Sequence, residues 1–172
     1  MSRARSTLLA LAACVATMAV AAPAPEFTHR QPGEWLNSAP LTLRALRGKV
    51  VLIEFFAFEC SNCLASRAWL EAVARAKADA GLVVVAVHTP ELPQERSAAN
   101  VREAVRRLGI TAPVMLDADY SYWRALDNGY WPAFYLVGRD GTLRGGAIGE
   151  LHLGTARAQR LEAQIDALLA AR

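Results

Sequence analysis

The sequence predicts an α/β fold in a single domain, with a central mixed β-sheet flanked by helices and a short N-terminal extension. Residues 50–56 read VVLIEFF, a continuous apolar run that is typical of a central strand covered on both faces. Strand-like and helix-like patterns alternate after this run. Two strands joined by a turn then precede the last helix, so the sheet must combine parallel and antiparallel neighbours.

The remaining elements follow from apolar periodicity and from glycines at the expected helix ends. Gly81 and Gly109 are placed to end helices, and Arg139-Asp140-Gly141 is typical of a hairpin turn. Residues 23–40, rich in Pro, Asn and Ser, predict an extended arm or a short edge hairpin. The expected order after 50–56 is a helix at about 62–80, a strand at 82–87, a helix near 97–108, a strand at 114–116, a helical turn at 120–126, strands at 133–137 and 142–148, and a helix at about 155–170.

The composition is that of a globular domain with no nucleic-acid partner. The 172 residues are 53% hydrophobic and 20% charged, which excludes a disordered chain. The net charge of +3 comes from 19 basic and 16 acidic residues that are well mixed along the chain. Because no basic stripe stands out, we expect no nucleic-acid binding.

The first 21 residues have the pattern of a secretory signal. Arg3 and Arg5 precede an almost wholly apolar stretch at 8–20, and Ala19-Val20-Ala21 offers a cleavage site. We therefore expect a domain at 22–172 that is exported, for example to a periplasm, and has no membrane span. A permanent anchor is disfavoured because the apolar stretch is shorter than the roughly 20 residues that span a bilayer. Lipidation at Cys14 is an alternative, although the apolar run continues past that residue.

Removal of the signal would leave Cys60 and Cys63, separated by two residues. A bridge that closes so small a loop removes little chain entropy, so this pair is chemical rather than structural. A cysteine at the first turn of a helix gains thiolate character from the free N–H groups there, which makes Cys60 the nucleophile. Cys63, one turn later, is the resolving thiol. We expect no cofactor beyond this redox-active pair, and no zinc, because two further ligands are lacking.

His88 offers an alternative function. It ends the expected strand at 82–87, and a copper-binding chaperone would use Cys60, Cys63 and His88 as ligands. We expect His88 to be structural instead, and we expect His29 and His152, which have no partner pattern, to lie at the surface. Stoichiometric copper binding without insulin reduction would favour the chaperone.

Several segments together resemble a known superfamily. The stretch VVLIEFFAFECSNC resembles the active-site strand and turn of the thioredoxin superfamily, and GYWPAFYLVGRDG resembles its cis-proline segment. More narrowly, the chain resembles TlpA/ResA-like extracytoplasmic reductases. It is especially similar to the thioredoxin-like domain of DipZ-type proteins, through LVVVAVHTPEL, NVREAVRRLGIT and GYWPAFYLV. The similarity covers roughly residues 35–150. It implies a thioredoxin-like fold and a reductant that exchanges dithiol and disulfide with protein partners and an electron-donor protein.

The resemblance also implies roles for further residues. A cis bond between Trp131 and Pro132 would place this segment beside Cys60 to receive the substrate backbone. Glu54 matches the buried acid that exchanges a proton with the resolving thiol, and burial should raise its pKa toward neutrality. Glu59 stands where thioredoxins commonly carry Trp, and its carboxylate would disfavour a thiolate if it pointed toward the sulfur.

Overall fold

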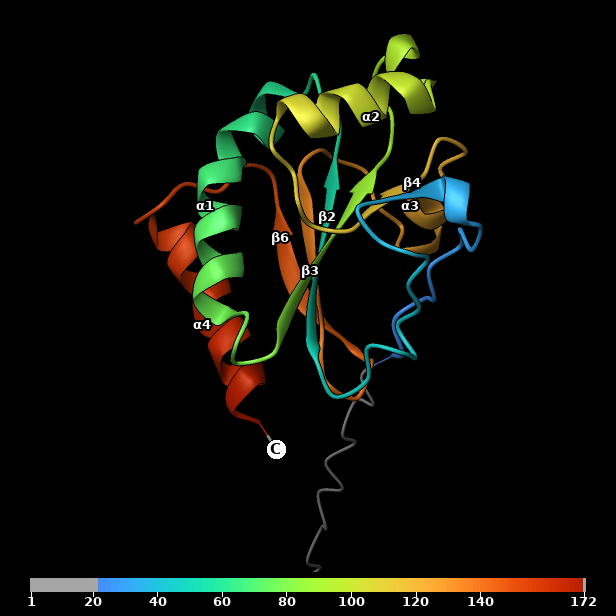
Figure 1. Cartoon of the computed structure of the whole chain (residues 1–172). Coiled ribbons are helices and arrows are strands. Elements are labelled where there is room, and N and C mark those ends of the chain that lie inside the picture. Colours follow the sequence, from blue (N-terminus) through green and yellow to red (C-terminus); the bar gives the residue numbers. More distant parts are fainter. Residues whose placement is uncertain (1–21, 172) are drawn as a thin grey trace, which may run out of the picture.

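The computed structural model describes residues 22–171, so the expected signal at 1–21 and Cys14 lie outside the described residues. A six-stranded sheet with the order β1-β4-β3-β2-β5-β6 forms the centre, and helices cover it (Figure 1). The strands are β1 (Trp35–Leu36), β2 (Val50–Phe56), β3 (Leu82–His88), β4 (Val114–Leu116), β5 (Ala133–Val137) and β6 (Leu143–Ile148). The helices are α1 (Ser61–Lys77), α2 (Ala98–Arg107), α3 (Ser121–Ala125) and α4 (Ala156–Ala170), with short 3-10 helices η1 (Pro32–Glu34) and η2 (Pro93–Arg96).

The sheet is mixed, as expected. Strand β3 runs parallel to both β2 and β4, whereas β5 is antiparallel to β2, β6 to β5 and β1 to β4. All seven residues of β2 are buried, because both faces of this central strand are covered. The fold class predicted from the sequence is therefore confirmed.

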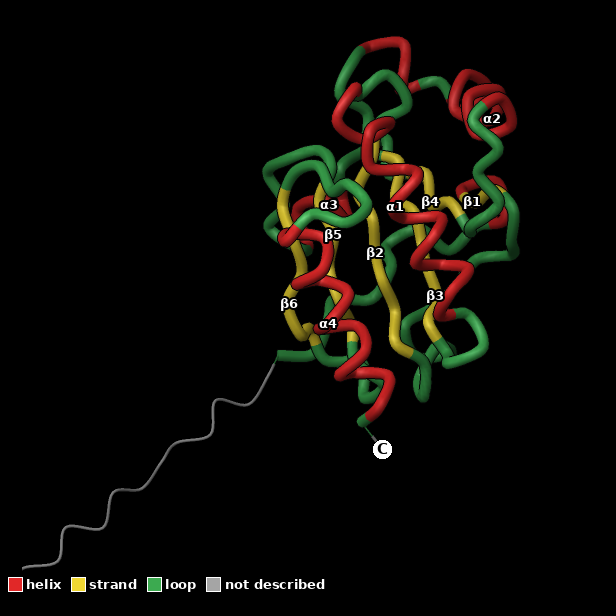
Figure 2. Tube along the Cα trace, turned by 90° about the vertical axis from the view of Figure 1, so that its left-hand side faces the viewer, coloured by secondary structure: helices red, strands yellow, loops and turns green. Residues whose placement is uncertain are grey.

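Helices α1 and α4 cover one face of the sheet, which Figure 2 shows from the helix side. Val50 and Leu52 of β2 point to this face and belong to the same apolar cluster as Trp69 of α1 and Leu161 of α4. The fully buried Trp69 packs edge-on against Phe134 and donates its indole N–H to the Glu162 carboxylate at 2.7 Å. Trp69 thus joins the two helices to each other and to the sheet.

The opposite face is covered by α3 and by the N-terminal segment. Ile53 and Phe55 of β2 point to this side and share a cluster with Phe27 and Tyr122. The Tyr122 ring stacks on Phe55, with centroids 5.9 Å apart, and its hydroxyl donates to the Pro25 carbonyl at 3.1 Å. The expected N-terminal arm therefore serves as a cover for the sheet, and part of it adds the edge strand β1.

Both ends of the described chain lie at one end of the sheet. Pro23 forms an antiparallel bridge to Thr142 at the β5–β6 turn. Arg139 in the same turn donates to the carbonyl of Leu169, near the end of α4, at 2.8 Å. Because Val137 is in register with Val51, this turn lies at the beginning of β2, away from the strand end that leads to Cys60.

The observed helices are slightly shorter than expected. Helix α1 ends at Lys77 rather than near residue 80, and Gly81, with a φ of 100°, ends the turn that leads into β3. No helix within residues 22–171 has the length and apolar character needed to cross a membrane.

Candidate redox site

Cys60 and Cys63 form a disulfide at the beginning of α1, with their Cα atoms 5.2 Å apart. Cys60 is the N-cap residue of the helix, and its Sγ accepts a hydrogen bond from the backbone N–H of Cys63 at 3.2 Å. Cys60 is 8% exposed and Cys63 only 2%. The more exposed cysteine is therefore the one at the helix N-terminus, where backbone N–H groups favour a thiolate.

The turn before the helix positions Cys60. Its backbone N–H donates to the Ala57 carbonyl at 3.3 Å. The Glu59 carboxylate would disfavour a Cys60 thiolate if it pointed toward the sulfur. In the structure it accepts a hydrogen bond from the side-chain amide of Gln94 at 2.6 Å. A hydrogen bond to η2 thus restrains this exposed carboxylate.

The segment at Trp131 and Pro132 packs beside the cysteines, and the bond between these two residues is cis. The half-buried Trp131 contacts the apolar cluster that contains both cysteines. Its indole N–H donates to the Thr89 carbonyl at 3.0 Å, and its ring lies 4.2 Å from that of Trp123. The fold therefore brings together Cys60, Cys63 and Trp131, which are far apart in the sequence.

Glu54 is buried beneath the active helix. It is 1% exposed and lies on β2 between Leu52 and Phe56, on the face covered by α1. Burial raises the pKa of Glu54 to about 7, opposed by the positive charge of Arg67 and reinforced by the negative charge of Glu71. Arg67 and Glu71 follow Cys63 at intervals of four, so all three lie on one side of α1. Glu54 therefore titrates near neutrality beneath the side of α1 that carries Cys63.

His88 is buried near the cysteine turn. Its ring stacks on Phe58, with centroids 5.5 Å apart, and its Nε2 has no hydrogen-bond partner among the described residues. Burial lowers its pKa to about 4, so the imidazole is neutral at physiological pH. Within residues 22–171, three His or acidic side chains bring their possible ligand atoms together in a group that includes neither His88 nor a cysteine.

That group consists of His29, Asp117 and Asp119, whose ligand atoms lie within 4.8 Å of one another. The expectation that His29 lies at the surface is wrong: its side chain is only 12% exposed and is 3.2 Å from both Glu34 and Asp119. Asp117 is fully buried and accepts hydrogen bonds from the backbone N–H groups of Tyr122 and Trp123. The hydrogen bonds and ion pairs of this group therefore join the N-terminal segment to the segment that contains α3. His152, by contrast, is exposed as expected.

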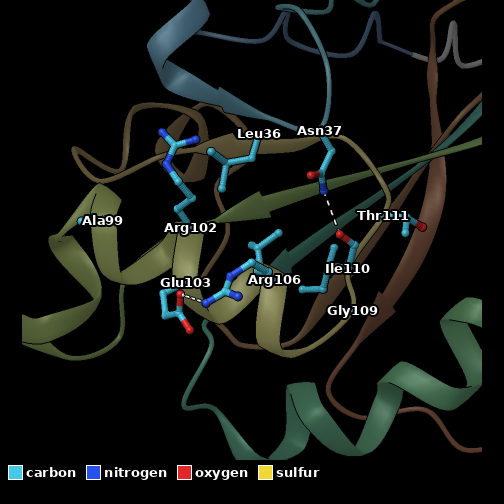
Figure 3. Close-up of a pocket in the computed structure, with 10 residues that line it drawn as sticks. Leu36, Asn37, Ala99, Arg102, Glu103, Arg106, Gly109, Ile110 and Thr111 are labelled. Atoms are coloured by element: carbon cyan, nitrogen blue, oxygen red, sulfur yellow. Dashed lines mark hydrogen bonds and ion pairs between the residues drawn. The ribbon is translucent and has the colours of Figure 1, made fainter.

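A cavity of about 590 Å³ lies elsewhere, between α2 and the segment after β1 (Figure 3). Leu36, Val105 and Ile110 give it an apolar lining, and Arg102 and Arg106 add positive charge. Asn37 closes one side by donating to the Ile110 carbonyl at 2.8 Å. Neither cysteine lines this cavity, so it is separate from the redox site.

Comparison with known proteins identifies the family of this chain. The Redoxin family matches residues 19–165. The chain belongs to this family. Protein DipZ of Mycobacterium bovis is 43% identical over 119 residues, which are 67% of this chain and 17% of DipZ. The thiol-disulfide oxidoreductase YkuV of Bacillus subtilis is 28% identical over 86% of this chain and 95% of its own length.

A solved structure supports the same assignment. The crystal structure of a thioredoxin-like superfamily protein matches this redoxin with a TM-score of 0.77 and 28% identity, covering 88% of this chain and 99% of that protein. The redoxin thus has a thioredoxin-like fold, and its relatives include a thiol-disulfide oxidoreductase. It spans about a sixth of the length of DipZ.

Sequence reasoning missed Glu95. This residue is 1% exposed, and its carboxylate accepts a hydrogen bond from the backbone N–H of Glu59 at 2.9 Å. Glutamate at the third position of a helix commonly caps it when Ser or Thr stands three residues earlier, but Leu92 stands there. The pattern therefore carried no signal for a contact between residues 36 positions apart.

Proposed function

We propose that this redoxin is an extracytoplasmic reductase of protein disulfides. The observation that carries the proposal is the position of Cys60 as the N-cap of α1, with Cys63 behind it in the same helical turn. The signal-like pattern of residues 1–21 supports export. The similarity to thiol-disulfide oxidoreductases supports exchange with protein thiols and disulfides.

In the proposed reaction the reduced enzyme donates two electrons to a partner disulfide. The Cys60 thiolate attacks one partner sulfur, forming a mixed disulfide and releasing the other sulfur as a thiolate that takes up a proton. Cys63 then attacks Cys60, and the second partner sulfur leaves. Glu54, with a pKa of about 7, accepts the Cys63 proton in this step. The product is the Cys60–Cys63 disulfide, and a dithiol electron donor must reduce it again.

Exposed apolar side chains near the disulfide support a polypeptide substrate. Leu64 follows Cys63 directly, and Tyr130 precedes the Trp131–Pro132 segment. Both are exposed, at 39% and 65%. A chain that lies against these side chains and the Trp131–Pro132 backbone would present its disulfide to Cys60.

A trapping experiment tests the order of the two cysteines. Reduced Cys63→Ser is mixed with insulin, quenched with acid and separated on a non-reducing gel. We expect a mixed disulfide at Cys60 to accumulate, because the resolving thiol is gone. The matched variant Cys60→Ser should form none, and equal trapping by both variants would overturn the assignment.

The direction of electron flow needs a second measurement. We expect the Cys60–Cys63 pair, equilibrated with glutathione buffers, to have a reduction potential well below about −200 mV. That value is near the high end of the reduction potentials of thioredoxin-like proteins that act as reductants. A potential near about −120 mV would mark a strong oxidant and would contradict the reductant role.

A further inference from the structure

The segment between β3 and α2 contacts both halves of the redox site. At its beginning, the Thr89 carbonyl accepts the indole N–H of Trp131 at 3.0 Å. At its end, the Glu95 carboxylate accepts the backbone N–H of Glu59, the residue before Cys60, at 2.9 Å. A single loop thus holds the turn that leads into the cysteine helix and the segment at Pro132.

Glu95 is a buried carboxylate whose partners in the structure are all backbone groups. Besides the Glu59 N–H, it accepts the N–H groups of Glu91 and Leu92 at 2.7 and 2.8 Å. None of the ion pairs formed within residues 22–171 includes it. A buried carboxylate is costly unless its oxygens are hydrogen-bonded, so these bonds hold both the loop and the side chain in place.

The contacts to Glu91 and Leu92 alone would describe a local cap of η2. The contact to Glu59 goes beyond such a cap, because it reaches another part of the fold. Glu59 lies in the turn in which the Cys60 N–H donates to the Ala57 carbonyl. The backbone of this turn sets the direction from which the Cys60 sulfur meets the N–H groups of α1, including that of Cys63.

We propose that Glu95 is a positioning residue for the redox pair, which holds Cys60 at the N-terminus of α1 through the Glu59 N–H. The proposal rests on the assignment of Cys60 as nucleophile. Without Glu95, the turn loses its external anchor, and the Cys60 thiolate is less well aligned with the N–H groups that stabilise it. Reaction at Cys60 should then slow at neutral pH, although a negative charge has been removed from its surroundings.

The test is the rate of Cys60 alkylation by iodoacetamide across pH 5–9, measured on the reduced protein with the label mapped by mass spectrometry. Glu95→Ala should slow alkylation about fivefold at pH 7 and move the midpoint of its pH profile upward. Glu95→Gln should fall between Glu95→Ala and the wild type, because its amide oxygen still accepts from Glu59. If Glu95→Ala does not fold, a slowed rate and a raised midpoint in Glu95→Gln decide the question.

Tyr120→Phe is the matched control. The Tyr120 hydroxyl donates to the Pro90 carbonyl in the same loop but does not reach Glu59, so this variant should lower the melting temperature and leave the alkylation profile unchanged. Faster alkylation in the Glu95 variants would mean that its charge matters instead, and an unchanged profile would mean a purely structural role; either result overturns the proposal. If wild-type Cys63 reacts before Cys60, the nucleophile assignment itself fails, whatever the Glu95 variants do.

Discussion

Glu54→Gln should remove most of the pH dependence of folding near neutrality. Burial holds the pKa of Glu54 at about 7, against 4.5 for an ordinary glutamate, and each pKa unit corresponds to about 1.4 kcal/mol. Because the pKa of Glu54 is higher in the folded state than in the unfolded state, protonation of its carboxyl favours folding. This contribution is complete below about pH 4.5 and is lost as the pH rises through 7. The charged group therefore costs the folded state about 3 kcal/mol at pH 9. Glutamine, which never ionises, avoids this cost.

The assay is urea unfolding of the oxidised protein at pH 4.5 to 9, followed by tryptophan fluorescence. We expect Glu54→Gln to match the wild type at pH 4.5 and to exceed its free energy of unfolding by about 3 kcal/mol at pH 9, or about 10 °C in melting temperature. The exposed Glu103, paired with Arg106, provides the control, because an exposed ion pair contributes little and Glu103→Gln should leave the pH dependence of stability close to that of the wild type. Parallel pH curves for Glu54→Gln and the wild type would refute the reasoning. In the reduced enzyme, the same variant should slow the resolving step while leaving the attack by Cys60 unchanged.

Two further predictions concern residues outside the redox site. Burial alone would lower the pKa of His29, but its hydrogen bond to Glu34 and the nearby charge of Asp119 raise it overall. His29→Gln should therefore cost about 1 kcal/mol of stability at pH 6 and less at pH 9, where the wild-type ion pairs are also lost; an equal loss at both values in urea unfolding would contradict this. Gly146→Ala should prevent folding, because a Cβ there would lie 1.9 Å from the Phe134 carbonyl oxygen. A native circular dichroism spectrum and an unchanged melting temperature would contradict this, because they would show that β6 can shift enough to accept the added Cβ.

Local patterns predicted most of the fold. The run VVLIEFF is buried along its whole length, and the Arg139-Asp140-Gly141 turn joins two antiparallel strands as expected. These features depend on neighbours in the chain, so a window of several residues is enough to recognise them. The cysteine pair was equally visible, because its spacing and the helix after it are local.

The missing parts depend on contacts between distant residues. His29 is bonded to Asp119, 90 positions away, and Glu95 to Glu59, 36 positions away. No periodicity marks such pairs, because these side chains lie in loops or in the short 3-10 helix η2, in segments whose path is set by the packing of the sheet. Burial of Glu54 was predicted since it interrupts an apolar strand, whereas Glu95 stands in a polar segment and reads as exposed.

The bridge between Pro23 and Thr142 and the bond from Arg139 to Leu169 place both ends of the described chain at the same pole of the molecule. The disulfide lies at the other pole, past the seven residues of β2, a distance of about 23 Å along an extended strand. A polypeptide or a lipid joined at either end would therefore attach the domain at the end opposite the disulfide, and the cysteines would lie far from the attachment point. This geometry suits a module that forms part of a longer polypeptide, and the region of DipZ that matches this chain is 17% of that protein.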